Sequence, residues 1–168
     1  MKKAFAFALP FLALMLGAPG TTLASDHVDG LKTALDKIVA TRKRRIGFVG
    51  LSFKTGTDDL RESPLVSLAE QLIGKGMELA IYDPEVRLSQ LLGANRRYIE
   101  QHLPHIGALL EADLANVIRR SDVLVVGMGS DAIADELTRH LQPHQVIVDL
   151  VRLPRRTALV GQVQGLCW

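Results

Sequence analysis

Short apolar runs alternate with helical stripes along most of the chain. Each run is mostly hydrophobic, which is typical of a buried strand in a parallel sheet. Each stripe repeats apolar residues at steps of three and four, which is typical of a helix with one buried face. The predicted strands are 46–51, 78–82, 123–126 and 145–150, with 163–168 as a last edge element. The predicted helices are 26–40, 64–74, 85–92, 114–119 and 131–141, while 94–111 has the least regular pattern.

This alternation predicts an α/β fold, a Rossmann-like parallel sheet with right-handed crossovers and helices on both faces, preceded by one helix. We divide the chain into an N-terminal segment (1–24), a helix (25–43) and one α/β domain (44–168). Ligands of such open sheets bind beyond the carboxyl ends of the strands. The loop after the first strand is therefore the expected ligand site.

The helix predicted after that loop has a clear start. Ser63 is a preferred N-cap residue, and Pro64 suits the first helical position because its missing N–H would have no partner there. We therefore expect the Ser63 side chain to cap this helix. Gly74 and Gly76 mark its end.

A basic run, Arg42-Lys43-Arg44-Arg45, follows the first predicted helix. Cations near a helix C-terminus are stabilised by the helix macrodipole, and this structural role is the favoured interpretation. The alternative is a patch that binds a polyanion.

The first 24 residues have the order of a secretory signal peptide: two lysines, an apolar stretch, a Gly-Ala-Pro-Gly break and small residues near Ser25. The apolar stretch is too short to cross a bilayer as a helix, so no stable membrane anchor is expected. The alternative is an apolar linker helix that packs against the domain. The segment alone leaves export open.

Charge and cysteine content exclude several classes of function. The formal net charge is +2, and Lys2 and Lys3 account for it, so the rest of the chain is neutral and nucleic-acid binding is not expected. Cys167 is the single cysteine, so no internal disulfide or cysteine cluster can form. The five histidines lack the spacing of a zinc site and are interpreted as surface residues, so no metal is expected.

The loop after the first strand carries the most specific motif. It reads Gly50-Leu-Ser-Phe-Lys-Thr-Gly-Thr-Asp-Asp-Leu-Arg-Glu-Ser-Pro64, and it resembles the signature of the C-terminal, sugar-nucleotide-binding domain of nucleotide-sugar 6-dehydrogenases, in the form closest to GDP-mannose 6-dehydrogenase. The resemblance extends over about residues 44–168, through Tyr82-Asp-Pro84 and the terminal Cys167-Trp168. The helix before it resembles the end of the family's inter-domain helix.

The motif makes sense as a reader of phosphate and sugar. Gly56 permits a turn, Thr57 and Ser63 can donate to anionic oxygens, and Lys54 supplies a mobile positive charge. The resemblance implies that Phe53 and Lys54 contact the bound sugar nucleotide. The expected substrate-binding residues are Phe53, Lys54, Thr57 and Arg152, with an exposed surface role as the alternative for Arg152. The expected loop-structuring residues are Gly56, Asp58, Asp59, Arg61 and Ser63, and the charged ones are expected, with Glu62, to form an ion-pair network.

The resemblance also implies an NAD-dependent oxidation, but two of its parts are missing from the sequence. The family's N-terminal domain binds NAD, and its catalytic cysteine lies in a Gly-Gly-Ser-Cys context. Gly47 and Gly50 do not form a dinucleotide fingerprint, and Cys167 matches the family's terminal Cys-Trp, so no catalytic residue is assigned. The NAD-binding domain is therefore taken to be absent.

Three hypotheses remain open at this point. The chain is part of a split or truncated GDP-mannose 6-dehydrogenase that needs an N-terminal catalytic half, a non-catalytic module that binds GDP- or UDP-sugars, or an inert fragment. GDP-mannose is the preferred ligand, although guanine and uracil are not distinguished by the residues themselves. The first helix is expected to leave an apolar face that drives homo-oligomerisation or partner binding. The resemblance favours the cytoplasm, whereas the N-terminal segment favours export.

Overall fold

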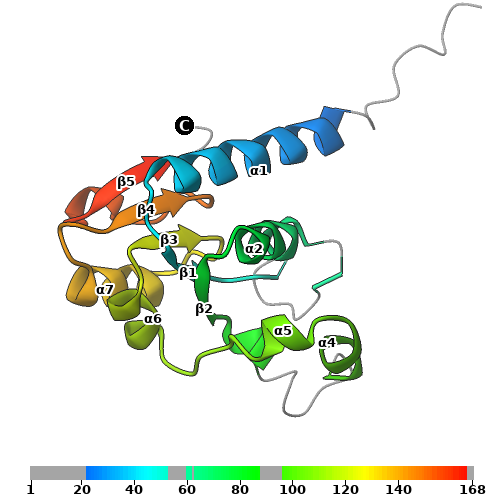
Figure 1. Ribbon diagram of the computed structural model, residues 1–168. Helices are drawn as coiled ribbons and strands as arrows, with labels where there is room; N and C mark the ends of the chain where they lie inside the picture. The colour runs from blue at the N-terminus through cyan, green and yellow to red at the C-terminus, as the bar shows by residue number, and fades with distance from the viewer. Residues whose placement is uncertain (1–21, 53–59, 62, 88–95, 166–168) are drawn as a thin grey trace, which may run out of the picture.

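The computed structural model describes residues 22–52, 60–61, 63–87 and 96–165 (Figure 1). Five parallel strands form one sheet in the order β2-β1-β3-β4-β5. The strands are β1 (Arg45–Val49), β2 (Glu78–Tyr82), β3 (Val123–Val126), β4 (Val146–Asp149) and β5 (Gln162–Gly165). The helices are α1 (Thr22–Ala40), α2 (Pro64–Gly74), α4 (Arg96–His102), α5 (Pro104–Gly107), α6 (Leu114–Arg120) and α7 (Asp131–His140), with a 3₁₀ turn η1 (Arg156–Ala158). The predicted Rossmann-like fold, with one helix before the first strand, is confirmed.

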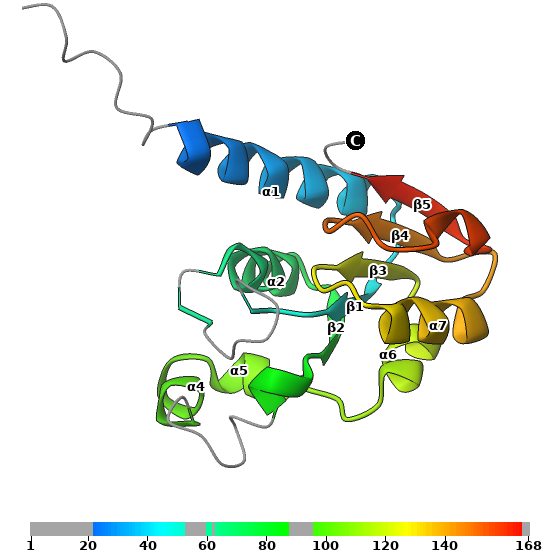
Figure 2. The same cartoon turned by 180° about the vertical axis from the view of Figure 1, so that it is seen from behind.

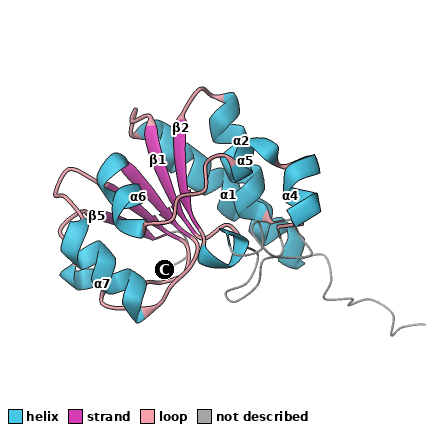
Figure 3. Cartoon of the chain, turned by 90° about the horizontal axis from the view of Figure 1, so that it is seen from below, coloured by secondary structure: helices cyan, strands magenta, loops and turns pink. Residues whose placement is uncertain are grey.

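Helices cover both faces of the sheet, as Figures 2 and 3 show. Alternate residues of each strand point to opposite faces, so one apolar strand supplies two cores. In β3, Val123 and Val125 join the core under α1 and α2, whereas Leu124 and Val126 join the core under α6 and α7. This explains why the strands are apolar at every position rather than at every second one.

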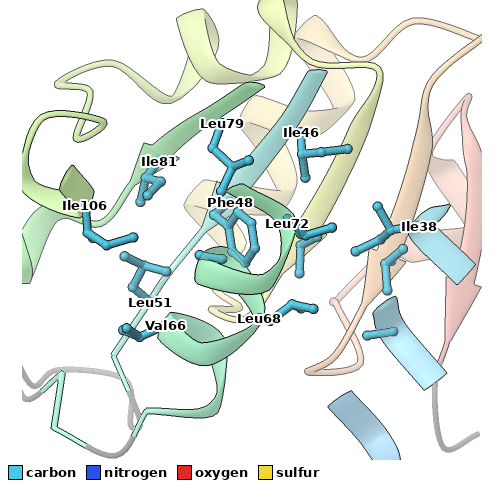
Figure 4. Close-up of a cluster of buried hydrophobic side chains, with 14 of the residues drawn as sticks. Ile38, Ile46, Phe48, Leu51, Val66, Leu68, Leu72, Leu79, Ile81 and Ile106 are labelled. Carbon is cyan, nitrogen blue, oxygen red and sulfur yellow. The ribbon is translucent and has the colours of Figure 1, made fainter. Parts of the chain in front are cut away.

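Phe48 lies at the centre of the first core (Figure 4). Its side chain is fully buried between the sheet and α2, which contributes Leu68 and Leu72. These side chains come from positions four residues apart, so they lie on one face of α2. The predicted apolar stripe of α2 is thus the face that packs on the sheet.

Helix α1 reaches the same core through Ala34 and Ile38, both fully buried. Over residues 30–40 the domain's own core therefore takes up much of the apolar face that the sequence predicted to be uncovered. Val39, 42% exposed, is the large apolar side chain that this stretch presents to solvent. None of the described helices is long and apolar enough to span a membrane. The N-terminal segment, up to residue 21, lies outside the described residues.

The prediction was weakest in three places. The irregular stretch 94–111 contains two short helices, α4 and α5, which were not predicted because the stretch has no long apolar stripe. The edge strand β5 begins one residue earlier than predicted, at Gln162, and pairs with β4 in parallel. Residues 84–87 are helical, and the rest of the helix predicted at 85–92 lies outside the described residues.

Two arginines of the basic run after α1 form hydrogen bonds with residues that precede other strands of the sheet. Arg44 donates from Nη2 to the carbonyl oxygen of Gly76 at 2.7 Å. Arg45 donates from Nε and Nη2 to both carboxylate oxygens of Asp122, at 3.0 and 2.7 Å. This guanidinium, through its hydrogen bonds and its charge, holds the pKa of the Asp122 carboxyl below its usual value. These two arginines therefore have specific partners that the sequence did not predict, and the macrodipole interpretation stays a prediction.

Candidate functional site

The strand order places a topological switch point at the carboxyl end of β1. Strand β1 pairs with β2 on one side and with β3 on the other. The helix after β1, α2, packs on one face of the sheet, and the helix after β3, α7, packs on the other. The loops after β1 and β3 thus diverge, which defines a topological switch point, where open α/β sheets bind ligands.

Gly50 brings the loops after β1 and β3 into close contact. Its φ of +89° is in the left-handed region, and its N–H donates to the carbonyl oxygen of Tyr82 at 2.8 Å. A Cβ atom at this position would lie 2.6 Å from Cβ of Met128, closer than real Cβ contacts. The backbone at the carboxyl end of β1 therefore requires glycine at position 50.

Asp83, which follows the neighbouring strand β2, fixes the start of the loop between β1 and α2, which is the expected ligand site. Its carboxylate is fully buried directly after β2. Oδ2 accepts from the main-chain N–H groups of Leu51 and Ser52, at 2.8 and 3.2 Å. Oδ1 accepts from the N–H groups of Glu85 and Val86, both at 3.1 Å, and so caps the helical turn that follows. One carboxylate thus holds two loops at the same edge of the sheet.

Ser63 closes the other end of the loop. Its side chain makes no hydrogen bond to the first turn of α2, so the predicted N-cap interaction was wrong. The hydroxyl is buried and donates instead to the carbonyl oxygen of Leu51 at 2.5 Å. Because Leu51 is also held by Asp83, residues on both sides of the 53–59 segment are anchored to the same point.

A second buried carboxylate shapes the loop after β4. Asp149 accepts from the N–H of Val151 at 3.1 Å and from the N–H of Leu153 at 3.0 Å. Between them, Arg152 has a left-handed φ of +57° and an exposed side chain. Within the described part of the chain, no hydrogen bond or ion pair of the Arg152 side chain is found. This guanidinium is thus available to an anion at the carboxyl edge.

The nearby Arg155 has a different environment. Its guanidinium pairs with Asp131 at 3.2 Å and with Asp135 at 2.9 Å, both on α7. These carboxylates compensate its charge. Arg152 is the better anion ligand of the two.

The structure describes only part of the predicted site. Arg61 is exposed, Ser63 is buried and Arg152 is exposed beside the end of β4. The other predicted residues lie outside the described residues: Phe53, Lys54, Gly56, Thr57, Asp58 and Asp59. Sequence reasoning missed the two buried aspartates, although Asp83 directly follows β2 and Asp149 is the last residue of β4. A polar residue at that position was the available signal.

The described residues contain no group of three or more His, Cys, Asp or Glu side chains that could hold a metal ion. His102, His105 and His144 are exposed, which agrees with their interpretation as surface residues.

Comparison with known proteins relates this geometry to a family. Residues 47–155 match the family described as "UDP-glucose/GDP-mannose dehydrogenase family, UDP binding domain". The chain is 45% identical over 154 residues to GDP-mannose 6-dehydrogenase of Pseudomonas aeruginosa, covering 92% of this chain and 34% of that protein. It is 41% identical over 149 residues to the enzyme of the same name from Azotobacter vinelandii, covering 88% and 34%.

Solved structures agree with these sequence matches. A crystal structure of a ternary complex of GDP-mannose dehydrogenase from Pseudomonas aeruginosa superposes with a TM-score of 0.78 at 44% identity, covering 88% of this chain and 33% of that one. A UDP-glucose dehydrogenase from Pyrobaculum islandicum, at 19% identity and a TM-score of 0.55, shares the fold. The chain spans about a third of the length of the relatives that it matches.

Proposed function

Because the chain belongs to the UDP-glucose/GDP-mannose dehydrogenase family, with residues 47–155 matching its UDP binding domain, we propose that it binds a nucleoside diphosphate sugar at the carboxyl edge of the sheet. GDP-mannose is the preferred ligand, because the two relatives named above are GDP-mannose 6-dehydrogenases. The supporting observation is the anchoring of the β1 loop at the switch point by Asp83 and Ser63. A loop with fixed ends loses less conformational entropy when it closes on a ligand.

In this proposal, Lys54 and Arg152 neutralise the diphosphate, while Phe53 and Thr57 contact the rest of the ligand. Gly56, Asp58, Asp59 and Arg61 shape the loop. The support for Arg152 is its exposed, uncompensated guanidinium at the end of β4. The other ligand contacts rest on the motif.

In the described part of the first βα turn, the main-chain N–H groups are not available to the diphosphate of a dinucleotide such as NAD. The three N–H groups after β1 have partners within the protein: that of Gly50 donates to Tyr82, and those of Leu51 and Ser52 donate to Asp83. The next helix, α2, begins at Pro64, which has no N–H to offer. We therefore assign no step of hydride transfer to the described residues.

We further propose that oxidation of the sugar requires an NAD-binding catalytic half, contributed by another polypeptide or by a longer form of this protein. The 168-residue chain alone is expected to bind the nucleotide sugar without reducing NAD. A role in polysaccharide biosynthesis, a cytoplasmic location and a homo-oligomeric state belong to the same proposal. They follow from the relatives' enzymatic name and not from the geometry of the site.

Isothermal titration of the chain with GDP-mannose tests the proposal, with UDP-glucose as the competing ligand. A charged hydrogen bond contributes about 1.5–3 kcal/mol, so Lys54→Ala should weaken binding by roughly 10- to 100-fold. Arg152→Ala should have a smaller effect, because its long side chain is exposed. Lys75→Ala, an exposed lysine at the opposite end of the sheet, is the matched control and should bind normally.

Absence of heat with both ligands, from a chain shown to be folded by circular dichroism, would contradict the binding proposal and favour an inert fragment. Binding with no reduction of NAD, even after addition of an NAD-binding half from a relative, would favour a non-catalytic binding module. Absorbance at the wavelength of NADH distinguishes this outcome from a split enzyme.

A further inference from the structure

A cavity of about 420 Å³ lies at the end of the sheet opposite the proposed nucleotide-sugar site. It is lined by Val146 and Gln162, the first residues of β4 and β5, and by the end of α1. Small-molecule sites have volumes of roughly 300–1,000 Å³, so this cavity has room for a small metabolite. Neither the motif nor the proposed function accounts for it.

Two lysines line this cavity, and none of its described lining residues is acidic. Lys37 on α1 donates from Nζ to the carbonyl oxygen of Gly165 at 2.8 Å. Lys43, in the loop between α1 and β1, donates from Nζ to the carbonyl oxygen of His144. Both acceptors are neutral, and among the described residues neither lysine forms an ion pair with a carboxylate, although the charge of Lys43 helps to lower the pKa of the Asp122 carboxyl, which is paired with Arg45. Each ammonium has three donors and keeps two for a ligand.

These hydrogen bonds distinguish the pair from ordinary solvated lysines. Both side chains are half-buried, and each is tied to a main-chain atom of a different segment, the end of β5 and the loop before β4. A lysine held in this way has already lost much of its rotamer freedom, which lowers the entropic cost of binding. The side-chain amides of Gln162 and Gln164 add neutral donors to the lining.

We propose that this cavity binds a small phosphate-bearing molecule, with Lys37 and Lys43 as the charged ligands. A phosphate monoester carries about −1.5 to −2 charges at neutral pH and offers three strong acceptor oxygens. It matches two ammonium groups in charge, whereas a single carboxylate would leave one ammonium unpaired. Lys43 is the residue of the basic run that lines the cavity, whereas Arg44 and Arg45 are engaged with Gly76 and Asp122.

The test is a titration of the ¹⁵N-labelled full chain with inorganic phosphate and with glycerol 3-phosphate at constant low ionic strength, followed by amide chemical shifts. Saturable shifts are expected around Lys37, Lys43 and His144 and not around Gly50. Lys37→Met and Lys43→Met keep the apolar stem and remove the charge, and each should weaken binding at least tenfold. Lys75→Met, which is not among the residues that line this cavity, should change nothing.

Tighter binding of glycerol 3-phosphate would identify an ester as the ligand, and tighter binding of inorganic phosphate would identify the free anion. The proposal is overturned if the wild-type chain shows no saturable shift up to roughly 10 mM, tenfold above a millimolar dissociation constant. It is equally overturned if both lysine variants bind as the wild type does. Lys54→Ala should leave these shifts intact, so the result is independent of the nucleotide-sugar proposal.

Discussion

Replacement of Asp83 by alanine should destabilise the protein more than replacement of other aspartates on its surface. The carboxylate is fully buried and accepts four main-chain hydrogen bonds. A buried N–H left without an acceptor costs about 1–3 kcal/mol, and loss of a helix cap costs about 0.5–2 kcal/mol. Because the N–H groups of Leu51 and Ser52 lose this acceptor and the helical turn loses its cap, we expect the free energy of unfolding to fall by about 3–6 kcal/mol, the middle of the range that these costs span.

Asp83→Asn separates the two functions of this carboxylate. Asparagine keeps one acceptor oxygen, which can still cap the helical turn through Glu85 and Val86. Its NH₂ group would then face the N–H groups of Leu51 and Ser52, and because all of these groups are donors, no hydrogen bond can form between them. The loss of stability should be roughly half that of Asp83→Ala, with the ligand loop affected and the helical turn retained.

Urea unfolding followed by far-ultraviolet circular dichroism measures these differences, and amide hydrogen exchange locates them. A domain with a stability near the middle of the usual range, about 10 kcal/mol, would still fold in the absence of denaturant after this loss. Asp135→Ala is the control, because it removes an exposed carboxylate paired with Arg155 and should cost at most about 1 kcal/mol. If Asp83→Ala unfolds within 1 kcal/mol of the wild type, with unchanged exchange at Leu51 and Ser52, then the buried carboxylate does not hold the loop.

Two further predictions concern the sheet edges. Gly50→Ala combines a left-handed φ with a Cβ that would lie 2.6 Å from Met128, and it should lower stability by about 2–5 kcal/mol, whereas Gly74→Ala, with open space around it, should be neutral or slightly stabilising in the same urea assay. The pKa of Asp122 is lowered in the folded state, so its pair with Arg45 stabilises the protein at neutral pH, and this contribution is lost as the pH falls through the folded-state pKa. The small stability difference between the wild type and Asp122→Asn should therefore vanish in acid, and a difference that persists there would refute the assignment.

The strands were predictable because they are buried on both faces. A run such as Val123–Val126 has no polar position, so its bounds could be predicted without error. The starts of β1, β4 and β5 were each misplaced by one residue, because a polar residue at a strand end gives no contrast with the loop before it. Helices α4 and α5 were missed because neither shows an apolar stripe: α4 buries Ile99 alone, and α5 has four residues.

The place of the motif-bearing loop in the fold was predictable, but the contacts that support this loop were not. The loop after the first strand could be identified from its motif and from the parallel topology. Ser63 was expected to cap α2, yet its hydroxyl donates to Leu51, twelve residues earlier. The contact of Asp83 with the same residue spans 32 positions. Such hydrogen bonds depend on which loops the completed sheet brings together. Local sequence preferences carry no information about this long-range arrangement.

The contact between α1 and β5 has a consequence for the order in which the chain folds. Lys37 and Gly165 are hydrogen-bonded although 128 positions separate them, and Figure 1 shows α1 beside β4 and β5. A ribosome that makes this chain releases α1 first and the strands that cover it last. The apolar side of the helix, which includes Ile38, therefore remains incompletely covered until β4 and β5 have been synthesised. Nascent chains truncated before β4 should therefore bind chaperones more strongly than the finished chain, since long-range packing of this kind forms late.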